Sequence, residues 1–254
     1  MSITKKHIIV FIAFYDLNII KKSFECLENL DSDIFIVENK SPYSKDIEEY
    51  FKDKNIIGYI QFNENVANNC IPLFNKDYSS LLNEYEYITY TDGDLYVIDA
   101  NDMFNEIFDS FKYGDIMVSS SEAWLGNCYL DENNNLIPVE SRSDFTDYLN
   151  EMKENNKEFG CKPSIMNKTS CHFFITLKKQ DLRHIYKMER YSDGAIYSLV
   201  VHNLKRKWYK TNKNIVYHIQ WDSYYDGNEY YEWKKKVNAT IWNGDRYSDY
   251  KIIK

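Results

Sequence analysis

Short apolar runs alternate with amphipathic stretches along residues 1–100 of the chain. The runs at residues 7–14, 34–37, 56–62 and 87–90 are nearly continuous, as is typical of strands buried on both faces of a sheet. Between them, apolar residues recur at helical spacing from a cap at Asp16 or Asn18 to Leu30, again over 46–51, and from the loop 63–69 to Leu82. This alternation predicts an α/β fold with a mostly parallel central sheet flanked by helices.

The pattern after residue 100 is less regular. We expect a helix over 102–111, strands over 115–118 and 170–177, a helix that starts near 193, and a last core strand over 215–219. Residues 121–169 are polar, with one expected helix at 145–155, and they predict a variable loop region beside the binding edge. We therefore expect one catalytic domain over residues 1–219, with residues 220–254 as an extension that packs on it.

Four of the expected loops follow strands directly. They begin at Phe14-Tyr15-Asp16, Glu38-Asn39, Asn65 and Asp92-Gly93-Asp94. In open α/β sheets, ligands bind in the crevice outside the carboxyl ends of the strands. The sequence therefore predicts that these loops line one binding edge.

The segment Asp92-Gly93-Asp94 is the most informative of these loops. Its two carboxylates repel each other, and a divalent cation such as Mn²⁺ or Mg²⁺, shared with a diphosphate, relieves that repulsion. Gly93 permits a tight turn and the close approach of a ligand. The alternative is an ordinary polar turn, because Asp-Gly pairs are common turn formers.

Composition excludes several classes of protein. The net charge of −8 argues against a protein that binds nucleic acid through broad phosphate neutralisation. The five cysteines form no CxxC pair, so neither a zinc site nor a disulfide framework is indicated, and a reducing interior fits best. The apolar run at 7–14 is too short to span a membrane and lacks a cleavage site, so we expect a soluble, cytoplasmic protein. The 23 tyrosines suit a carbohydrate surface, but an AT-rich genome explains them equally well.

Together with Ser192-Asp193-Gly194 and His218, these loops resemble GT-A fold glycosyltransferases, most closely family 2, over residues 7–219. The resemblance implies a cation, Mn²⁺ or Mg²⁺, held by Asp92, Asp94 and His218, with Asp92 and Gly93 also contacting the donor. It places the nucleotide base against Glu38 or Asn39 and against Phe14 or Tyr15. Asp16 and Asn65 belong to the donor-binding loops in the same comparison.

The resemblance further implies transfer of a sugar from a nucleotide donor, with a UDP-sugar first among the candidates, to a hydroxyl of a glycan, a lipid-linked glycan or a small acceptor. Asp193 matches the general base of an inverting enzyme, although an Asp before a helix also serves as an N-cap. Trp124 and Trp221 could stack on the acceptor or fill the core. We expect no nucleic-acid partner, and no Lys/Arg stripe supports membrane contact.

Two other functions remain open. A nucleotidyltransferase shares this layout, but it would be expected to carry a Gly-rich signature with Arg and Lys after the first strand, where this chain has Ala13-Phe14-Tyr15-Asp16. A non-catalytic binding protein could keep the fold without turnover, because fold does not determine function.

Overall fold

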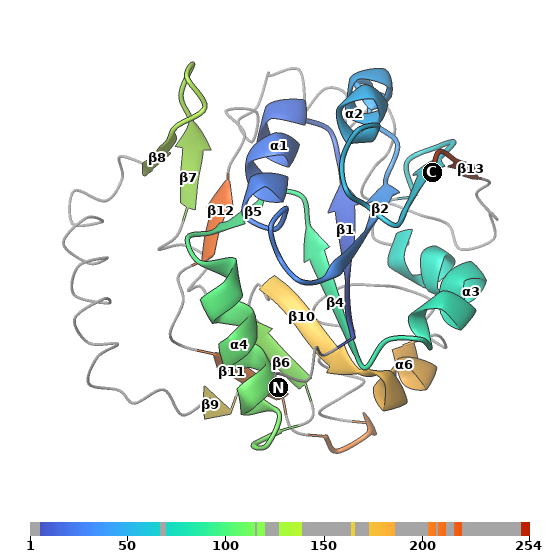
Figure 1. Cartoon of the computed structure of the whole chain (residues 1–254), viewed down its shortest axis with the longest axis vertical. Coiled ribbons are helices and arrows are strands. Elements are labelled where there is room, and N and C mark those ends of the chain that lie inside the picture. Colours follow the sequence, from blue (N-terminus) through green and yellow to red (C-terminus); the bar gives the residue numbers. More distant parts are fainter. Residues whose placement is uncertain are drawn as a thin grey trace.

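The computed structural model describes residues 6–66, 70–114, 116–119, 127–138, 164–165, 173–185, 203–206, 208–211, 216–219 and 250–254. Figure 1 shows these residues as two sheets with helices packed around the larger one. None of the described helices is both long enough and apolar enough to cross a membrane.

Within the described residues, the larger sheet has nine strands in the order β13-β3-β2-β1-β4-β10-β6-β11-β9. Strands β1 to β4 run parallel, and β6 has the same direction, because β10 is antiparallel to both β4 and β6. The expected α/β class with a mostly parallel central sheet is confirmed. The bounds of the strands are β1 (His7–Ala13), β2 (Asp33–Glu38), β3 (Gly58–Phe62), β4 (Tyr87–Asp92), β6 (Ile116–Ser119), β9 (Ser164–Ile165), β10 (Phe173–Lys178), β11 (Trp208–Thr211) and β13 (Tyr250–Ile252).

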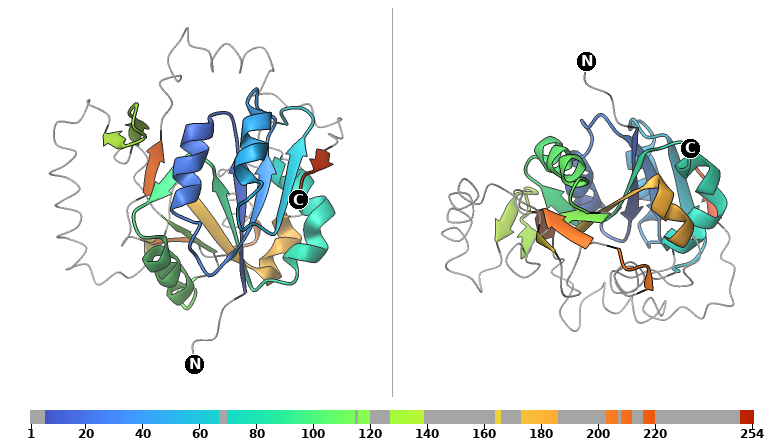
Figure 2. Two further views of the ribbon diagram at one scale, coloured as in Figure 1. Left: turned by 45° about the horizontal axis from the view of Figure 1, so that its top comes forward. Right: turned by 90° about the horizontal axis from the view of Figure 1, so that it is seen from below.

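Helices cover both faces of this sheet. One face packs against α1 (Leu17–Glu25), α2 (Ser44–Phe51) and α4 (Ala100–Ser110), which contribute Phe24, Phe51 and Phe104 to a common apolar core. The other face packs against α3 (Cys70–Leu82) and α6 (Lys179–Ile185), through Phe74 and Leu182. Figure 2 shows α1 and α2 on the near side of the sheet in its left view. Because both faces are covered, the inner strands consist almost entirely of buried residues.

A second, smaller sheet lies beside α1. It contains β5 (Leu95–Val97), β12 (Val216–Ile219), β7 (Asn127–Leu130) and β8 (Leu136–Pro138) in the order β5-β12-β7-β8. The expected last core strand over residues 215–219 is present as β12, and its Val216 is buried in the large apolar core, but it belongs to the small sheet rather than to the main one. The place beside β4 in the main sheet is taken by β10, and β12 instead pairs antiparallel with β5.

The observed bounds differ from the expected ones at a few places. Helix α1 ends at Glu25 rather than at Leu30, because the chain continues in tighter turns in which the amides of Leu27 and Leu30 bond to carbonyls three residues back. The short strands β5 and β13 have no sequence signal of their own. Of the expected extension 220–254, only residues 250–254 are described, and β13 pairs with β3 at the edge of the main sheet.

Candidate functional site

The order of the strands locates a crevice between β1 and β4. From β1 the chain passes to β2 and β3 on one side, whereas β4 lies on the other side of β1. Ligands of open α/β sheets bind at such a switch point, outside the carboxyl ends of the strands. In the parallel register, Ile12 lies opposite Asp92 and Ala13 lies opposite Glu38, so the loops after β1, β2 and β4 start at the same level.

The Asp92-Gly93-Asp94 turn connects β4 of the main sheet to β5 of the small sheet. A Cβ atom at Gly93 would lie 2.7 Å from the carbonyl oxygen of Ile12 and 3.3 Å from the ring of Phe11. The glycine is therefore required by the close approach of this turn to β1, rather than by an unusual φ. The side chain of Asp92 is exposed and that of Asp94 is partly exposed at the crevice.

The structure brings His218 to this turn from the far end of the chain. Strand β12 pairs with β5 so that His218 lies opposite Leu95, and the amide of Ile219 donates to the carbonyl oxygen of Asp94 at 2.8 Å. The Nε2 atom of His218 is then 3.1 Å from Oδ2 of Asp94. Backbone pairing thus brings these two residues, 124 positions apart in the sequence, next to each other.

The electrostatics of His218 reflect this contact. Burial lowers the pKa of the imidazole, but the charge of Asp94, its hydrogen bond and the charge of Asp92 together outweigh burial, so the pKa of His218 is raised above its usual value. Asp92 also acts on the buried thiol of Cys70 at the start of α3: burial, with a contribution from this carboxylate, raises the pKa of Cys70 to about 12. Both carboxylates therefore contribute to the local field.

The donor set can be compared with the needs of a cation. Among the described residues, no three His, Cys, Asp or Glu side chains are grouped closely enough to hold a metal ion by themselves, so the expected trio of Asp92, Asp94 and His218 is not assembled. Mg²⁺ in proteins is typically held by only one or two carboxylates, and substrate phosphates and water supply the other ligands. The pair Asp94 and His218 fits such a shared site, with carboxylate and imidazole donors suited to Mn²⁺.

The loop after β1 differs from the expectation. Tyr15 is only 5% exposed, with its ring packed against Tyr43 at a centroid distance of 5.4 Å and grouped with Ile19 and Ile219. Its ring is thus not available to a nucleotide base, whereas the half-buried Phe14 is the more accessible of the two. Asp16 is the N-cap of α1 and accepts from the amides of residues 18 and 19. The structure therefore gives Asp16 a structural task.

The acid at the end of β2, Glu38, also points into the protein. Glu38 has no exposed surface, and its carboxylate accepts hydrogen bonds from Ser44, Tyr59 and Gln61. Burial raises the pKa of Glu38, and these hydrogen bonds oppose that shift. The expected contact of Glu38 with the base is therefore not met in this structure, because the carboxylate has no surface that a ligand could touch.

Asn39 and Asn65 lie at the neighbouring positions of the same edge. Asn39 is 7% exposed, and its Oδ1 accepts from the amide of Val66 at 2.9 Å, so it ties the loop after β2 to the loop after β3. Asn65 is half-buried in that second loop. The sequence-predicted Asp193, Trp124 and Trp221 lie outside the described residues.

Sequence reasoning missed the side chains that hold these loops in place. Ser44, Tyr59 and Gln61 surround Glu38, and Ser41 donates to the carbonyl oxygen of Tyr15 at 3.0 Å. The only signal in the sequence is the pair Ser41 and Ser44, two serines three residues apart at the start of a helix. Tyr59 and Gln61 sit in a strand, where nothing distinguishes them from ordinary strand residues.

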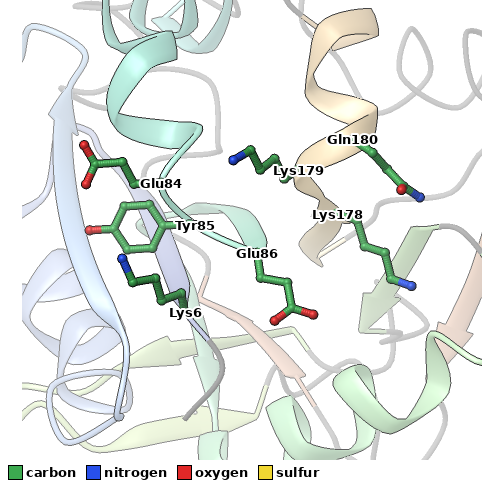
Figure 3. Close-up of a pocket in the computed structure, with 7 residues that line it drawn as sticks. All are labelled: Lys6, Glu84, Tyr85, Glu86, Lys178, Lys179 and Gln180. Carbon is green, nitrogen blue, oxygen red and sulfur yellow. The ribbon is translucent and has the colours of Figure 1, made fainter. Parts of the chain in front are cut away.

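An open hollow of about 710 Å³ lies at the other ends of the strands, away from the crevice. Its walls come from the residue before β1, the turn before β4, and the junction of β10 with α6 (Figure 3): Lys6, Glu84, Tyr85, Glu86, Lys178, Lys179 and Gln180. Its walls carry both positively charged lysines and negatively charged glutamates. It lies at the amino ends of β1 and β4. The hollow is therefore separate from the crevice that carries the paired acids.

No family model matches the chain. It is similar to uncharacterized proteins of Acanthamoeba polyphaga mimivirus: L142 is 28% identical over 260 residues, which cover 94% of this chain and 49% of that protein. L138 is 26% identical over 271 residues, covering 98% of this chain and 28% of that protein. The chain thus spans about half or less of the length of these relatives, whose descriptions assign no activity.

Solved structures give distant likenesses. S. aureus TarS 1-349 in complex with UDP-GlcNAc has a TM-score of 0.46 and 12% identity, covering 95% of this chain and 68% of that one. The 4-diphosphocytidyl-2C-methyl-D-erythritol synthase of Anaerococcus prevotii has a TM-score of 0.44 and 8% identity, covering 82% of this chain and 88% of that one. Values this low leave the function to be argued from the residues of this chain.

Proposed function

We propose that the chain is a metal-dependent glycosyltransferase that moves a sugar from a nucleotide donor, a UDP-sugar in the first instance, to a hydroxyl of a glycan, lipid-linked glycan or small acceptor. One observation carries the proposal: His218 lies 3.1 Å from Asp94 at the carboxyl edge of β1 and β4. A histidine delivered to a paired-acid turn at the switch point of an α/β sheet supports a site for a cation and a diphosphate.

The chemistry needs a place for developing negative charge. When the bond between the anomeric carbon and the diphosphate oxygen breaks, the electron pair stays on the departing nucleoside diphosphate. A cation held by Asp94 and His218 would neutralise that charge. In this proposal Asp94 and neutral His218 provide fixed ligands, and the exposed Asp92 faces the ribose or supports the cation.

The remaining roles are assigned from the place of each described residue at the crevice and, for Asp193, from the sequence resemblance alone. Phe14 offers a half-buried ring beside the crevice, and Asn39 and Asn65 lie on the neighbouring loops. We retain Asp193 as the general base that removes the proton of the acceptor hydroxyl while the anomeric carbon is attacked from the side opposite the diphosphate, which gives inversion. Asp193→Asn then abolishes transfer and leaves donor binding close to that of the wild type.

The loop after β1 weighs against a nucleotidyltransferase. In the structure Asp16 caps α1 with a carboxylate and Tyr15 is packed inside, so this loop presents a negative charge, and no Lys or Arg, to a triphosphate. The products separate the two reactions. A glycosyltransferase releases a nucleoside diphosphate, whereas a nucleotidyltransferase forms its nucleotide-sugar with release of pyrophosphate.

The test is thermal stabilisation by UDP-, GDP-, CDP- and dTDP-sugars, each with Mn²⁺ and with EDTA. A ligand that binds only the native state at a hundredfold excess over its Kd stabilises it by about 2.7 kcal/mol. We expect a rise in Tm for one nucleotide series, with Mn²⁺ only. Absence of any rise, together with absence of slow donor hydrolysis, would instead indicate a non-catalytic protein.

Asp94→Ala should remove the Mn²⁺-dependent part of donor binding, because it deletes one of the two assembled ligands. Asp109→Ala, an exposed acid on α4, is the matched control and should bind donor as the wild type does. Donor affinity is measured by isothermal titration calorimetry with Mn²⁺ and with EDTA. Full Mn²⁺-dependent affinity in Asp94→Ala would refute the assignment of the cation site.

A further inference from the structure

Glu38 is a carboxylate placed where none of its surface reaches solvent. It is the last residue of β2, has no exposed area, and accepts hydrogen bonds from the hydroxyls of Ser44 and Tyr59 and, at 2.7 Å, from Nε2 of Gln61. Burying a carboxyl group is costly unless hydrogen bonds compensate it. Among the described residues no side chain forms an ion pair with Glu38, although the charge of Lys40 favours its ionised form, so the hydrogen bonds are its main compensation.

The partners of Glu38 show what it connects. Ser44 begins α2, and Tyr59 and Gln61 belong to β3, so the Glu38 network (Glu38, Ser44, Tyr59 and Gln61) joins three elements at one point. The Oγ atom of Ser44 also lies 2.7 Å from the carbonyl oxygen of Ser41. The network therefore fixes both ends of the loop formed by residues 39–43.

That loop holds the two neighbouring loops in turn. Asn39 accepts from the amide of Val66 in the loop after β3, and Ser41 donates to the carbonyl oxygen of Tyr15 in the loop after β1. Tyr15 has φ 64°, a left-handed conformation that is costly for a tyrosine and persists only where its surroundings fix it. The surroundings here are the Ser41 hydroxyl, the ring of Tyr43, and Ile219 next to His218.

We propose that Glu38 is a positioning residue for the nucleotide: without touching it, the buried carboxylate holds the loops after β1, β2 and β3 in the shape that receives the base and ribose. This inference rests on the proposed function. It differs from direct recognition, in which the carboxylate itself would bond to the base.

Tyr59→Phe separates the two roles. Tyr59 is 1% exposed, so its hydroxyl cannot touch a ligand and can affect one only through its buried neighbours Glu38 and Gln61. Tyr85→Phe is the matched control, because its hydroxyl also donates to a carboxylate, Oδ2 of Asp33 at 2.6 Å, but at the opposite edge of the sheet. Both variants lose one tyrosine-to-carboxylate hydrogen bond.

Binding of UDP, and in parallel GDP, CDP and dTDP, is measured by calorimetry with Mn²⁺ well below the Tm of each variant. Positioning predicts that Tyr59→Phe weakens nucleotide binding by roughly tenfold, the equivalent of about 1.4 kcal/mol, while Tyr85→Phe binds as the wild type does. Adding Glu38→Gln to Tyr59→Phe should cost little more, because both substitutions disable one network. Wild-type affinity in Tyr59→Phe together with lost affinity in Glu38→Gln would establish direct recognition and overturn the proposal.

Hydrogen exchange gives a readout that needs no nucleotide. In Tyr59→Phe the amides of residues 14–16, 39–41, 43 and 65–66 should exchange faster than in the wild type, and in Tyr85→Phe they should not. Unchanged exchange in Tyr59→Phe would overturn the positioning role even if the wild type binds nucleotide. If exchange is faster in Tyr59→Phe but the wild type binds no nucleotide, the result would refute the proposed function and, with it, the nucleotide part of this inference.

Discussion

Gly93 shows how a single residue sets the geometry of the paired acids. It lies between Asp92 and Asp94, and its α-carbon passes so close to β1 that an added Cβ would be 2.7 Å from the carbonyl oxygen of Ile12. The atom in the way belongs to the backbone of a central strand, which cannot move aside as a flexible side chain can. The separation of the two carboxylates therefore depends on the absence of a side chain between them.

Gly93→Ala should destabilise the protein by about 1–3 kcal/mol, the range for overpacking in a core, and should also weaken Mn²⁺-dependent donor binding because the turn must shift. Ile98→Ala is the control in the same segment. Its side chain is 56% exposed, so its effect should stay within about 0.5 kcal/mol. Urea denaturation measures both, and equal stability of the two variants would contradict the close-approach argument.

A second residue-scale feature is the buried imidazole of His7. Its Nδ1 is 2.7 Å from Oγ of Ser32 and its Nε2 is 2.8 Å from Oγ1 of Thr89, with the rings of Phe104 and Phe108 beside it. Burial lowers the pKa of His7 to about 3. The folded state thus favours the neutral ring, and the unfolded chain binds one more proton between pH 6.5 and pH 3.

The free energy of unfolding should therefore fall as the pH is lowered from about 6.5 towards 3, and the contribution of His7 is fully present only above its unfolded pKa. His7→Gln should be less stable at pH 7. Its unfolding free energy should also depend less steeply on pH, because about one fewer proton is taken up on unfolding. His184→Gln on α6 controls for the change in composition. Denaturation at a series of pH values measures the slope, and an unchanged slope in His7→Gln would show that another group causes the acid sensitivity.

At the scale of elements, Asp16 illustrates how a loop residue can serve a helix. Its carboxylate accepts from the amides of Asn18 and Ile19 at 2.8 and 3.1 Å and so caps α1. Asp16→Ala should cost about 0.5–2 kcal/mol, whereas Asp16→Asn, which keeps the cap, should cost little. Both should retain donor affinity at temperatures where they are folded. If Asp16→Asn has the same Tm as the wild type but binds donor less well, Asp16 contacts the donor directly.

The sequence predicted the helices and inner strands of the first half well, because the spacing of buried apolar residues differs between helices and strands and is visible in the sequence. It placed Asp92, Asp94 and the loops after β1 and β2 at one edge, since parallel strands end together. It could not foretell that Glu38 and Tyr15 turn inward, because this depends on Tyr59, Gln61 and Ser41, which contact them only in the folded chain. Likewise, β5 and β12 are short, and their pairing depends on contacts between distant parts of the folded chain rather than on a local sequence pattern.

For the molecule as a whole, β13 completes one edge of the main sheet from residues close to the end of the sequence. Tyr250 packs against Phe62 and Tyr78 and donates to Asp77 at 3.0 Å. The neighbouring Lys251 makes an exposed ion pair with Glu48 at 2.9 Å. These two residues hold the strand through different interactions, ring packing and surface charge.

Ring packing should account for most of this attachment. Tyr250→Ala should cost about 1–3 kcal/mol, because it exposes apolar surface on Phe62 and Tyr78, whereas Lys251→Ala should stay within about 1 kcal/mol as an exposed pair. Thermal unfolding in low and high salt compares them. A larger loss in Lys251→Ala, or a strong salt dependence in Tyr250→Ala, would show that charge rather than packing fastens β13.

The contact between Asp94 and His218 spans 124 positions of the sequence, and this separation has a consequence for the making of the protein. A ribosome adds about 5–20 residues each second, so His218 is polymerised roughly 6 to 25 s after Asp94. Throughout that interval the nascent chain carries the acids without the imidazole. A growing chain can therefore form the proposed cation site only after residue 218 has been made and β12 has paired with β5.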